Sequence, residues 1–236
     1  MSDVAEAYRT VRTAIYFGAP GDDTQTILVT SPSPGDGKTT SASNLAIAMA
    51  QAGERVLLMD CDFRKPMQHR VFGADNAAGL STVLSLRDPF AKAVRKTDTP
   101  GLYLLPSGPV PANPSELLNG EPFNQLLTKL RTKFHRIVID SPPVMPVADA
   151  RILGASSDLT VLVLRAGKST RRMSVQACDS LASVGSRILG VVVNDVARRR
   201  RSGYSNYGYS GYGCGGKSTH DMEGPSKAPA EQAAEV

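Results

Sequence analysis

Short apolar runs alternate with longer amphipathic stretches along most of the chain. The runs are rich in β-branched residues and lack polar alternation, which is typical of strands that are buried on both faces of a parallel sheet. The predicted strands lie near residues 26–30, 55–59, 102–106, 136–140, 159–165 and 187–194, and the principal helices near residues 39–52, 114–132, 147–155 and 171–184. This alternation predicts an α/β fold with helices flanking a mostly parallel central sheet.

The alternating pattern continues without a linker break as far as Asn194. The chain has 236 residues, of which 41% are hydrophobic, so it can bury one large core. From Ala197 onward the apolar periodicity stops, and Arg, Gly, Ser and Tyr dominate. We therefore expect one domain over residues 1–196 and a flexible, basic, tyrosine-rich tail over residues 197–236.

The segment after the first predicted strand has the composition of a phosphate-binding loop. Residues 31–40 read Ser-Pro-Ser-Pro-Gly-Asp-Gly-Lys-Thr-Thr and lead into a predicted helix. Gly35 and Gly37 would let backbone N–H groups turn toward phosphate oxygens. Lys38 would reach the β- and γ-phosphates, and the Thr39 hydroxyl would bind Mg²⁺. The strict P-loop pattern has glycine where this chain has Pro32, so a simple turn before a helix is the alternative.

Carboxylates follow two of the predicted strands. Asp60 and Asp62 come after the strand near 55–59, and Asp140 ends the strand near 136–140. Because the carboxyl ends of parallel strands share one crevice, these side chains are expected near the phosphates. Carboxylates there can hold Mg²⁺ directly or through its waters. The alternative for each aspartate is a turn-starting residue without a site.

Four of the seven tyrosines fall within nine residues of the predicted tail, at Tyr204, Tyr207, Tyr209 and Tyr212. They follow a run of four arginines, residues 198–201, and are interspersed with Gly, Ser and Asn. A packing role is implausible in such a composition. The sequence therefore predicts a phosphate donor site and a cluster of phosphate acceptors on one chain.

Together these motifs resemble the bacterial tyrosine kinases, or BY-kinases, of capsule and exopolysaccharide export. The resemblance covers nearly the whole chain and rests on Walker A, A′ and B motifs at residues 34–39, 57–66 and 138–143, the segments 105–108 and 111–118, Glu6-x-x-Arg9-x-x-Arg12 and the tyrosine cluster. It implies a P-loop NTPase fold and an ATP-dependent tyrosine autokinase. Such an enzyme would phosphorylate its C-terminal tyrosines in trans and regulate polysaccharide polymerisation and export.

The resemblance also implies roles for individual residues. Lys38, Asp60, Asp62 and Asp140 would be catalytic, with Asp60 as the base for the incoming tyrosine or, alternatively, as a further metal ligand. Thr39, Asp62 and Asp140 would organise Mg²⁺. The expected nucleotide-binding residues are Gly35, Asp36, Gly37, Lys38, Thr39, Thr40 and Asn194. A strand-ending turn explains Asn194 nearly as well as a contact with adenine.

The N-terminal segment is expected to form an amphipathic helix over about residues 3–17. Ala7, Val11, Ala14 and Ile15 supply an apolar strip, while Glu6, Arg9 and Arg12 recur at three-residue spacing. The resemblance implies that these three charged residues make intersubunit contacts in a ring of kinases. An exposed charged face without a partner is the alternative.

The resemblance further implies partners and a location. A membrane-bound chain-length regulator would activate the kinase, a tyrosine phosphatase would reverse it, and the chain would be cytoplasmic and recruited to the inner face of the membrane. The sequence shows no apolar run of spanning length, and its net charge of +5 comes without a nucleic-acid reader motif, so no nucleic acid is expected. Cys61, Cys178 and Cys214 have no metal or disulfide spacing and are expected to be reduced thiols.

Two other classes share part of this pattern. A Min/Par-type partitioning ATPase would have the same loop and strand-end aspartates, but that group normally carries a second lysine where this chain has Ser33. A non-catalytic scaffold that binds nucleotide only to assemble with the export machinery is the second. Tail phosphotyrosine formed with Mg²⁺·ATP would exclude both.

Overall fold

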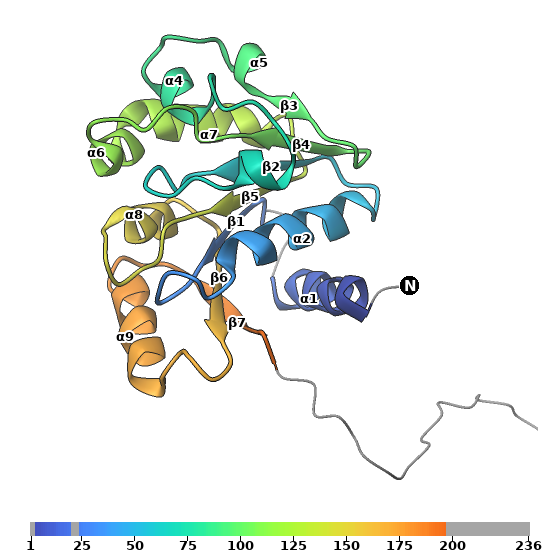
Figure 1. Ribbon diagram of the computed structural model, residues 1–236, viewed down its shortest axis with the longest axis vertical. Helices are drawn as coiled ribbons and strands as arrows, with labels where there is room; N and C mark the ends of the chain where they lie inside the picture. The colour runs from blue at the N-terminus through green and yellow to red at the C-terminus, as the bar shows by residue number, and fades with distance from the viewer. Residues whose placement is uncertain (1–2, 20–23, 197–236) are drawn as a thin grey trace, which may run out of the picture. The chain divides into compact units, whose positions relative to one another are not determined.

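The computed structural model describes residues 3–19 and 24–196, which form a seven-stranded sheet covered by helices (Figure 1). The strands are β1 (Thr26–Thr30), β2 (Val56–Asp60), β3 (Arg95–Lys96), β4 (Leu102–Leu105), β5 (Arg136–Asp140), β6 (Leu159–Arg165) and β7 (Ile188–Asn194). Their order in the sheet is β3-β4-β2-β5-β1-β6-β7. The short edge strand β3 runs antiparallel to β4, and the other neighbouring strands pair in parallel. The predicted mostly parallel α/β fold is confirmed.

Both faces of the sheet are covered, as its continuous apolar strands require. The helices are α1 (Asp3–Gly18), α2 (Lys38–Ala50), α3 (Gln68–Val71), α4 (Leu80–Leu84), α5 (Phe90–Ala93), α6 (Pro114–Asn119), α7 (Glu121–Arg131), α8 (Asp149–Ala155) and α9 (Arg171–Ala182). Alternate strand residues point to opposite faces: Ile27 and Val29 join the core under α1 and α2, whereas Leu28 joins the core under α4 and α7. This layering leaves the carboxyl ends of β1, β2 and β5 side by side.

One predicted helix is divided in two. The amphipathic pattern over 114–132 predicts a single helix, but α6 ends before Gly120, whose backbone is extended with φ −79° and ψ 155°. Pro122 occupies the first turn of α7, where its missing N–H is not needed. The two helices continue the same apolar face, with Leu118 and Phe123 in one core, so the periodicity across the break still resembles one helix.

The N-terminal helix is present as expected, but its buried strip differs from the predicted one. Tyr8 and Ile15 are buried against α2 and the sheet, while Ala7 and Ala14 are exposed. Tyr8 also donates a hydrogen bond from Oη to Ser41 Oγ on α2 at 3.4 Å. A side chain as long as tyrosine spans the gap between two helices that alanine would leave open, so the buried strip is centred on Tyr8 and Ile15.

Asp158 connects three segments at the amino end of the sheet. Its Oδ2 accepts hydrogen bonds from the backbone N–H groups of Gln25 and Thr26 at 2.9 and 2.7 Å, and Oδ1 accepts one from Arg131 Nη2 at 2.8 Å. Burial alone would raise the pKa of Asp158, but the hydrogen bonds from Thr26 and Gln25 and the charge of Arg131 outweigh it and lower the pKa. The ionised carboxylate is therefore the form that holds the start of β1.

Asp158→Asn should lower the free energy of unfolding at neutral pH by about 1–2 kcal/mol, because charge-assisted hydrogen bonds are lost at a partly exposed site. A lowered folded-state pKa gives stability that is present above the unfolded pKa and lost as pH falls through the folded value. The variant should therefore lose less stability than the wild type on acidification below about pH 4. Urea unfolding across that range measures this, with the exposed Asp98→Asn as control; parallel pH profiles of Asp158→Asn and wild type would contradict it.

Candidate active site

The loop between β1 and α2 has the bent backbone that its glycines allow. Gly35 and Gly37 have positive φ values of 79° and 98°, and α2 begins at Lys38. Asp36 is buried, and its Oδ2 accepts a hydrogen bond from the Ser33 N–H at 3.0 Å. Asp36 thus closes the loop on itself through Oδ2, while its Oδ1 lies 3.8 Å from Lys168 Nζ.

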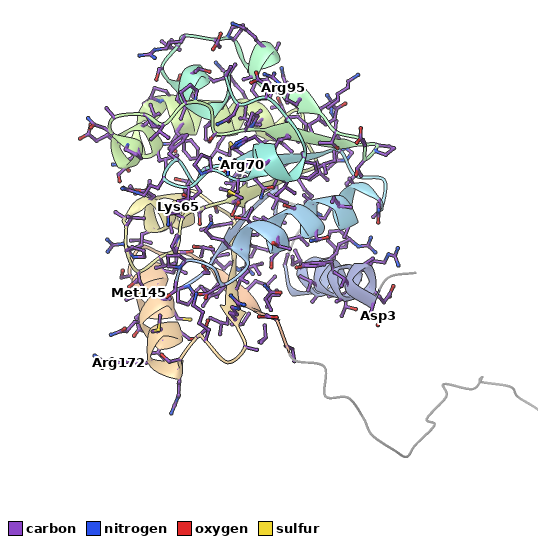
Figure 2. All side chains as sticks on the ribbon, in the orientation of Figure 1. Asp3, Lys65, Arg70, Arg95, Met145 and Arg172 are labelled. Atoms are coloured by element: carbon purple, nitrogen blue, oxygen red, sulfur yellow. The ribbon has the colours of Figure 1, made fainter. Side chains whose placement is uncertain are left out.

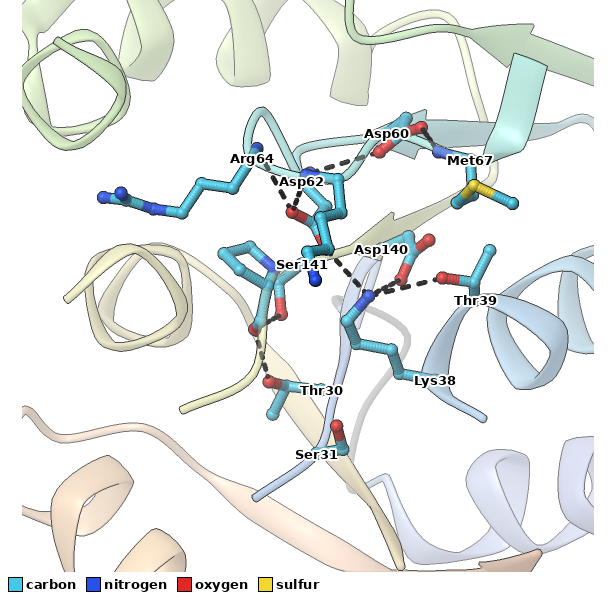
Figure 3. Close-up of polar contacts among 12 residues, drawn as sticks. Thr30, Ser31, Lys38, Thr39, Asp60, Asp62, Arg64, Met67, Asp140 and Ser141 are labelled. Carbon is cyan, nitrogen blue, oxygen red and sulfur yellow. Dashed lines mark hydrogen bonds and ion pairs between the residues drawn. The ribbon is translucent and has the colours of Figure 1, made fainter. Parts of the chain in front are cut away.

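Lys38 meets the two predicted metal-binding carboxylates at the end of the sheet (Figure 3). Its Nζ lies 2.8 Å from Asp62 Oδ2, 3.9 Å from Asp140 Oδ1 and 3.3 Å from Thr39 Oγ1. Strands β2 and β5 are neighbours, and Asp60 pairs in register with Asp140. The structure therefore brings together Lys38 and Asp140, which are 102 positions apart in the sequence.

Carboxyl groups outnumber cations in this cluster. Asp60, Asp62 and Asp140 are at most 3% exposed, and Lys38 is the one cation that pairs with any of them in the described ion pairs. Burial, and then the charge of Asp140, raises the pKa of Asp60, and burial also raises the pKa of Asp140 despite Lys38. Burial would lower the pKa of Lys38, but the charges of Asp140 and Asp62 outweigh it and raise the pKa. Such a cluster favours a further cation.

The residues predicted to hold Mg²⁺ fit that ion. Asp140 Oδ1 is buried and accepts no hydrogen bond from the described residues, so it is available to an ion or to its water. The Thr39 hydroxyl and the Asp62 carboxylate both contact Lys38 Nζ. Together with Asp140 they present the oxygen atoms that Mg²⁺ requires.

Within the described part of the chain, Asp60 is held by backbone N–H groups alone, whereas Asp62 also contacts Lys38. Its Oδ1 accepts the Asp62 N–H at 3.1 Å, and its Oδ2 accepts the N–H groups of Met67 and Gln68 at 3.1 and 3.0 Å. The residue is fully buried. In this arrangement Asp60 shapes the segment 62–68, and its role as a base remains a prediction.

A cavity of about 600 Å³ opens in front of Lys38, Thr39 and Asp62, whereas Asp60 and Asp140 do not line it. It is lined by the P-loop and start of α2, by the segment after β2 and by the proline-rich segment after β5: Pro34, Gly35, Gly37, Lys38, Thr39, Thr40, Asp62, Arg64, Lys65, Met67, Pro142, Pro143, Pro146 and Val147. Its volume is within the range of small-molecule sites, and its position at the carboxyl ends of the strands is where open α/β sheets bind ligands.

Two contacts that support the site were not predicted. Gln68 donates from Nε2 to Asp140 Oδ2 at 2.9 Å and to the Thr39 carbonyl at 3.2 Å, which fixes the Asp140 carboxylate. Arg64 pairs with the fully buried Asp149, with Nε 2.9 Å from Oδ2. Glutamine and aspartate at these positions carry no local signal, since both contacts join distant parts of the chain.

Other predicted residues lie away from the cavity or outside the described residues. Asn194 donates from Nδ2 to the Asp36 carbonyl at 3.1 Å, so its amide is engaged by the loop. Glu6, Arg9 and Arg12 lie on α1, and the tail tyrosines, with Cys214, belong to residues 197–236, outside the described part. Cys61 is buried, and burial raises the pKa of its thiol well above the usual range, in agreement with an unreactive cysteine. Within residues 3–19 and 24–196 no helix has the length and apolarity to cross a membrane.

Comparison with known proteins agrees with the fold and the site. Residues 24–170 match the AAA domain family. Tyrosine-protein kinase YwqD of Bacillus subtilis (strain 168) is 39% identical over 207 residues, which cover 88% of this chain and 86% of YwqD. The chimerical protein CapA2B2 is similar in structure, with a TM-score of 0.81 and 36% identity over 84% of this chain and 87% of that chain. The kinase domain of Escherichia coli tyrosine kinase ETK has a TM-score of 0.80 and 33% identity over 87% of this chain and 80% of that chain.

The glycine loop, the strand-end carboxylates and the mostly parallel sheet define a P-loop nucleotide-binding enzyme. Within that class, the chain belongs to the bacterial tyrosine kinases. This membership sets aside the Min/Par-type alternative. The full-length tyrosine-protein kinase etk of E. coli (strain K12) is much longer, and the chain covers 28% of it.

Lys38→Met should destabilise the ligand-free protein by about 3 kcal/mol, since breaking a buried ion pair leaves a carboxylate without compensation. Adding Asp62→Asn to Lys38→Met should recover part of this loss, because the uncompensated charge is then removed. Urea unfolding of the single and double variants measures the effect, with the exposed Lys129→Met as control. Additive losses from the two substitutions would show that the 2.8 Å contact contributes no coupling.

Proposed function

We propose that this enzyme transfers the γ-phosphoryl group of ATP to tyrosines in the tail of a neighbouring copy, and thereby regulates capsule or exopolysaccharide polymerisation and export. The observation that carries the proposal is the position of Lys38, within 4 Å of Asp62 and Asp140, at one end of a nucleotide-sized cavity. Membership of the tyrosine kinase family supports the reaction type. The four tyrosines between positions 204 and 212 supply the acceptors.

The chain's own groups suit phosphoryl transfer. In the proposed reaction Lys38 leaves the carboxylates and binds the β- and γ-phosphates. The N–H groups of the loop and of the start of α2 bind the remaining phosphate oxygens. Thr39, Asp62 and Asp140 would hold Mg²⁺, which supplies positive charge against the charge that develops on the phosphoryl oxygens. Gln68 keeps the Asp140 carboxylate oriented through its 2.9 Å hydrogen bond. In phosphoryl transfer, positioning of the reacting groups and neutralisation of the phosphate charge account for most of the rate enhancement.

Asp60 is assigned as the base that accepts the hydroxyl proton of the incoming tyrosine. Phosphoryl transfer through a loose transition state needs no strong base, since the phenol proton leaves late. Asp60 is enclosed by backbone N–H groups from the segment 62–68, so its action as a base requires that segment to move. An additional metal-binding role for Asp60 is the alternative, and Asp60→Asn separates the two: as a base, Asp60 is needed for transfer much more than for ATP binding.

Assembly of several copies is part of the proposal. On α1, Glu6 and Arg9 form an ion pair at 2.8 Å on the exposed side, whereas Arg12 donates from Nη1 to the Ala48 carbonyl of α2 at 2.9 Å. Arg12 is thus fixed against its own subunit, and Glu6 with Arg9 presents the outer edge of the helix. A ring formed through this edge would bring one subunit's tail to the site of the next.

Further partners follow from the same proposal. A membrane-bound chain-length regulator would activate the kinase at the inner face of the membrane, and a tyrosine phosphatase would reset it. The similarity to CapA2B2, which is a chimerical protein, supports a second protein as partner.

The direct test is to incubate the full chain with Mg²⁺·ATP and an activating membrane protein fragment, and to map phosphotyrosine by mass spectrometry. Modification should fall on Tyr204, Tyr207, Tyr209 and Tyr212, and replacing all four by phenylalanine should remove most of it while nucleotide binding is retained. Asp60→Asn should reduce transfer by about 100-fold or more if the residue acts as a base. Nucleotide binding without any phosphotyrosine would favour the scaffold alternative.

Replacing Arg9 and Arg12 together with alanine should lower the oligomer size and slow phosphorylation in trans. Because Arg12 also contacts α2, the single variant Arg9→Ala isolates the exposed edge and should give the larger share of the loss in assembly. Sedimentation velocity and urea unfolding of both variants separate assembly from stability. An unchanged sedimentation coefficient for Arg9→Ala and for the double variant would exclude this surface as the interface.

A further inference from the structure

Three consecutive carbonyl groups of the P-loop are each bound by a side chain from the carboxyl ends of β6 and β7 or the connection after β6. Lys168 Nζ donates to the Pro34 carbonyl at 2.6 Å, Arg165 Nη1 to the Gly35 carbonyl at 3.2 Å and Asn194 Nδ2 to the Asp36 carbonyl at 3.1 Å. Arg165 ends β6, Lys168 lies in the connection from β6 to α9, and Asn194 ends β7. We name these three side chains the carbonyl clamp.

The clamp acts on the same peptide groups that would bind phosphate. A trans peptide is planar, so its C=O and the N–H of the following residue point in opposite directions. Holding the carbonyls of residues 34, 35 and 36 outward therefore turns the N–H groups of Gly35, Asp36 and Gly37 toward the cavity. Among the described residues, none accepts a hydrogen bond from these three N–H groups. They are free for a ligand.

Within the clamp, Arg165 has a second partner. Asp195 accepts hydrogen bonds from Arg165 Nε at 2.9 Å and contacts Nη2 at 2.8 Å. Asp195 has a φ of 56°, in the left-handed region that aspartate adopts more readily than most residues other than glycine. Gly37 is required beside Asn194, because a Cβ there would lie 1.8 Å from Asn194 Nδ2. The loop and the clamp are therefore fitted to each other.

The loop's sequence explains the need for such a device. Pro32 stands where the strict pattern has glycine, and Pro34 has no N–H, so the front of the loop offers fewer donors than a standard P-loop. Each remaining N–H group must then point directly at a phosphate oxygen. A cation or amide bound to a carbonyl also polarises the peptide and strengthens its N–H as a donor.

We propose that Arg165, Lys168 and Asn194 are positioning residues for the nucleotide phosphates, acting through the P-loop backbone. Asn194 accordingly serves the phosphate loop and not the adenine ring. This inference deepens the proposed function and rests on its nucleotide site. It assigns a function to a basic pair, Arg165 and Lys168, that lies outside the three Walker motifs.

The test is calorimetric titration of the full chain with Mg²⁺·ADP and, separately, with inorganic tripolyphosphate and Mg²⁺. Lys168→Met, Arg165→Met and Asn194→Ala should each weaken both ligands by about tenfold, because both depend on the aimed N–H groups. Lys168→Arg should retain most of the affinity. In phosphorylation assays, KM for ATP should rise by a similar factor while kcat changes by less than about twofold.

Controls separate the clamp from a general effect of charge or folding. Arg172→Met removes a positive charge from exposed α9, just beyond the same connection, and should leave both affinities unchanged (Figure 2). Asn194→Ala leaves the net charge unaltered, so a lower affinity of this variant for tripolyphosphate cannot arise from the loss of a positive charge. Urea unfolding without ligand detects any variant that loses affinity through instability.

Several results would overturn the inference. Weaker ADP binding with unchanged tripolyphosphate binding would mean that these side chains contact the base or sugar. A lower urea midpoint with unchanged affinities would mean a structural role alone. Either result overturns the clamp while leaving the nucleotide site intact, whereas a wild-type chain that binds neither ligand would overturn the nucleotide site and the clamp together.

Discussion

One ammonium group, on Lys38, faces three buried aspartates at the carboxyl end of the sheet, and the rest of the site depends on this imbalance. Parallel pairing of β2 with β5 forces Asp60 and Asp140 side by side, so their mutual repulsion is built into the fold. In the ligand-free protein, part of the cost is reduced by raised pKa values and by backbone N–H groups at Asp60. A bound metal and nucleotide would complete the charge balance.

The P-loop lies between this acidic cluster and the carbonyl clamp. On its inner side the first residue of α2, Lys38, contacts Asp62; on its outer side Arg165, Lys168 and Asn194 bind its carbonyls. The loop is therefore restrained from both sides before a nucleotide binds. Preorganised donors lose little entropy on binding, which compensates for the N–H groups that the two prolines remove.

Sequence predicts those parts of this architecture whose signals are local. The central strands are continuous apolar runs, and the glycine loop and strand-end aspartates are recognisable because their chemistry constrains a few adjacent residues. The division at Gly120 was missed, since the apolar face continues across it. Gln68, Asp149 and Lys168 were missed because each acts on a partner 72 to 134 residues away, and such contacts leave no periodic or spacing signal. The orientation of Asn194 likewise depends on the absence of a side chain at Gly37.

The central claim is that Lys38 leaves the carboxylates for phosphate when nucleotide binds. A crystal structure of the protein with Mg²⁺·ADP tests it most directly. The account predicts that the 2.8 Å contact between Lys38 Nζ and Asp62 Oδ2 opens beyond hydrogen-bonding distance, with Nζ bonded to a β-phosphate oxygen and the metal near Thr39 and Asp140. A lysine that still contacts Asp62 while the phosphates bind elsewhere would contradict the account.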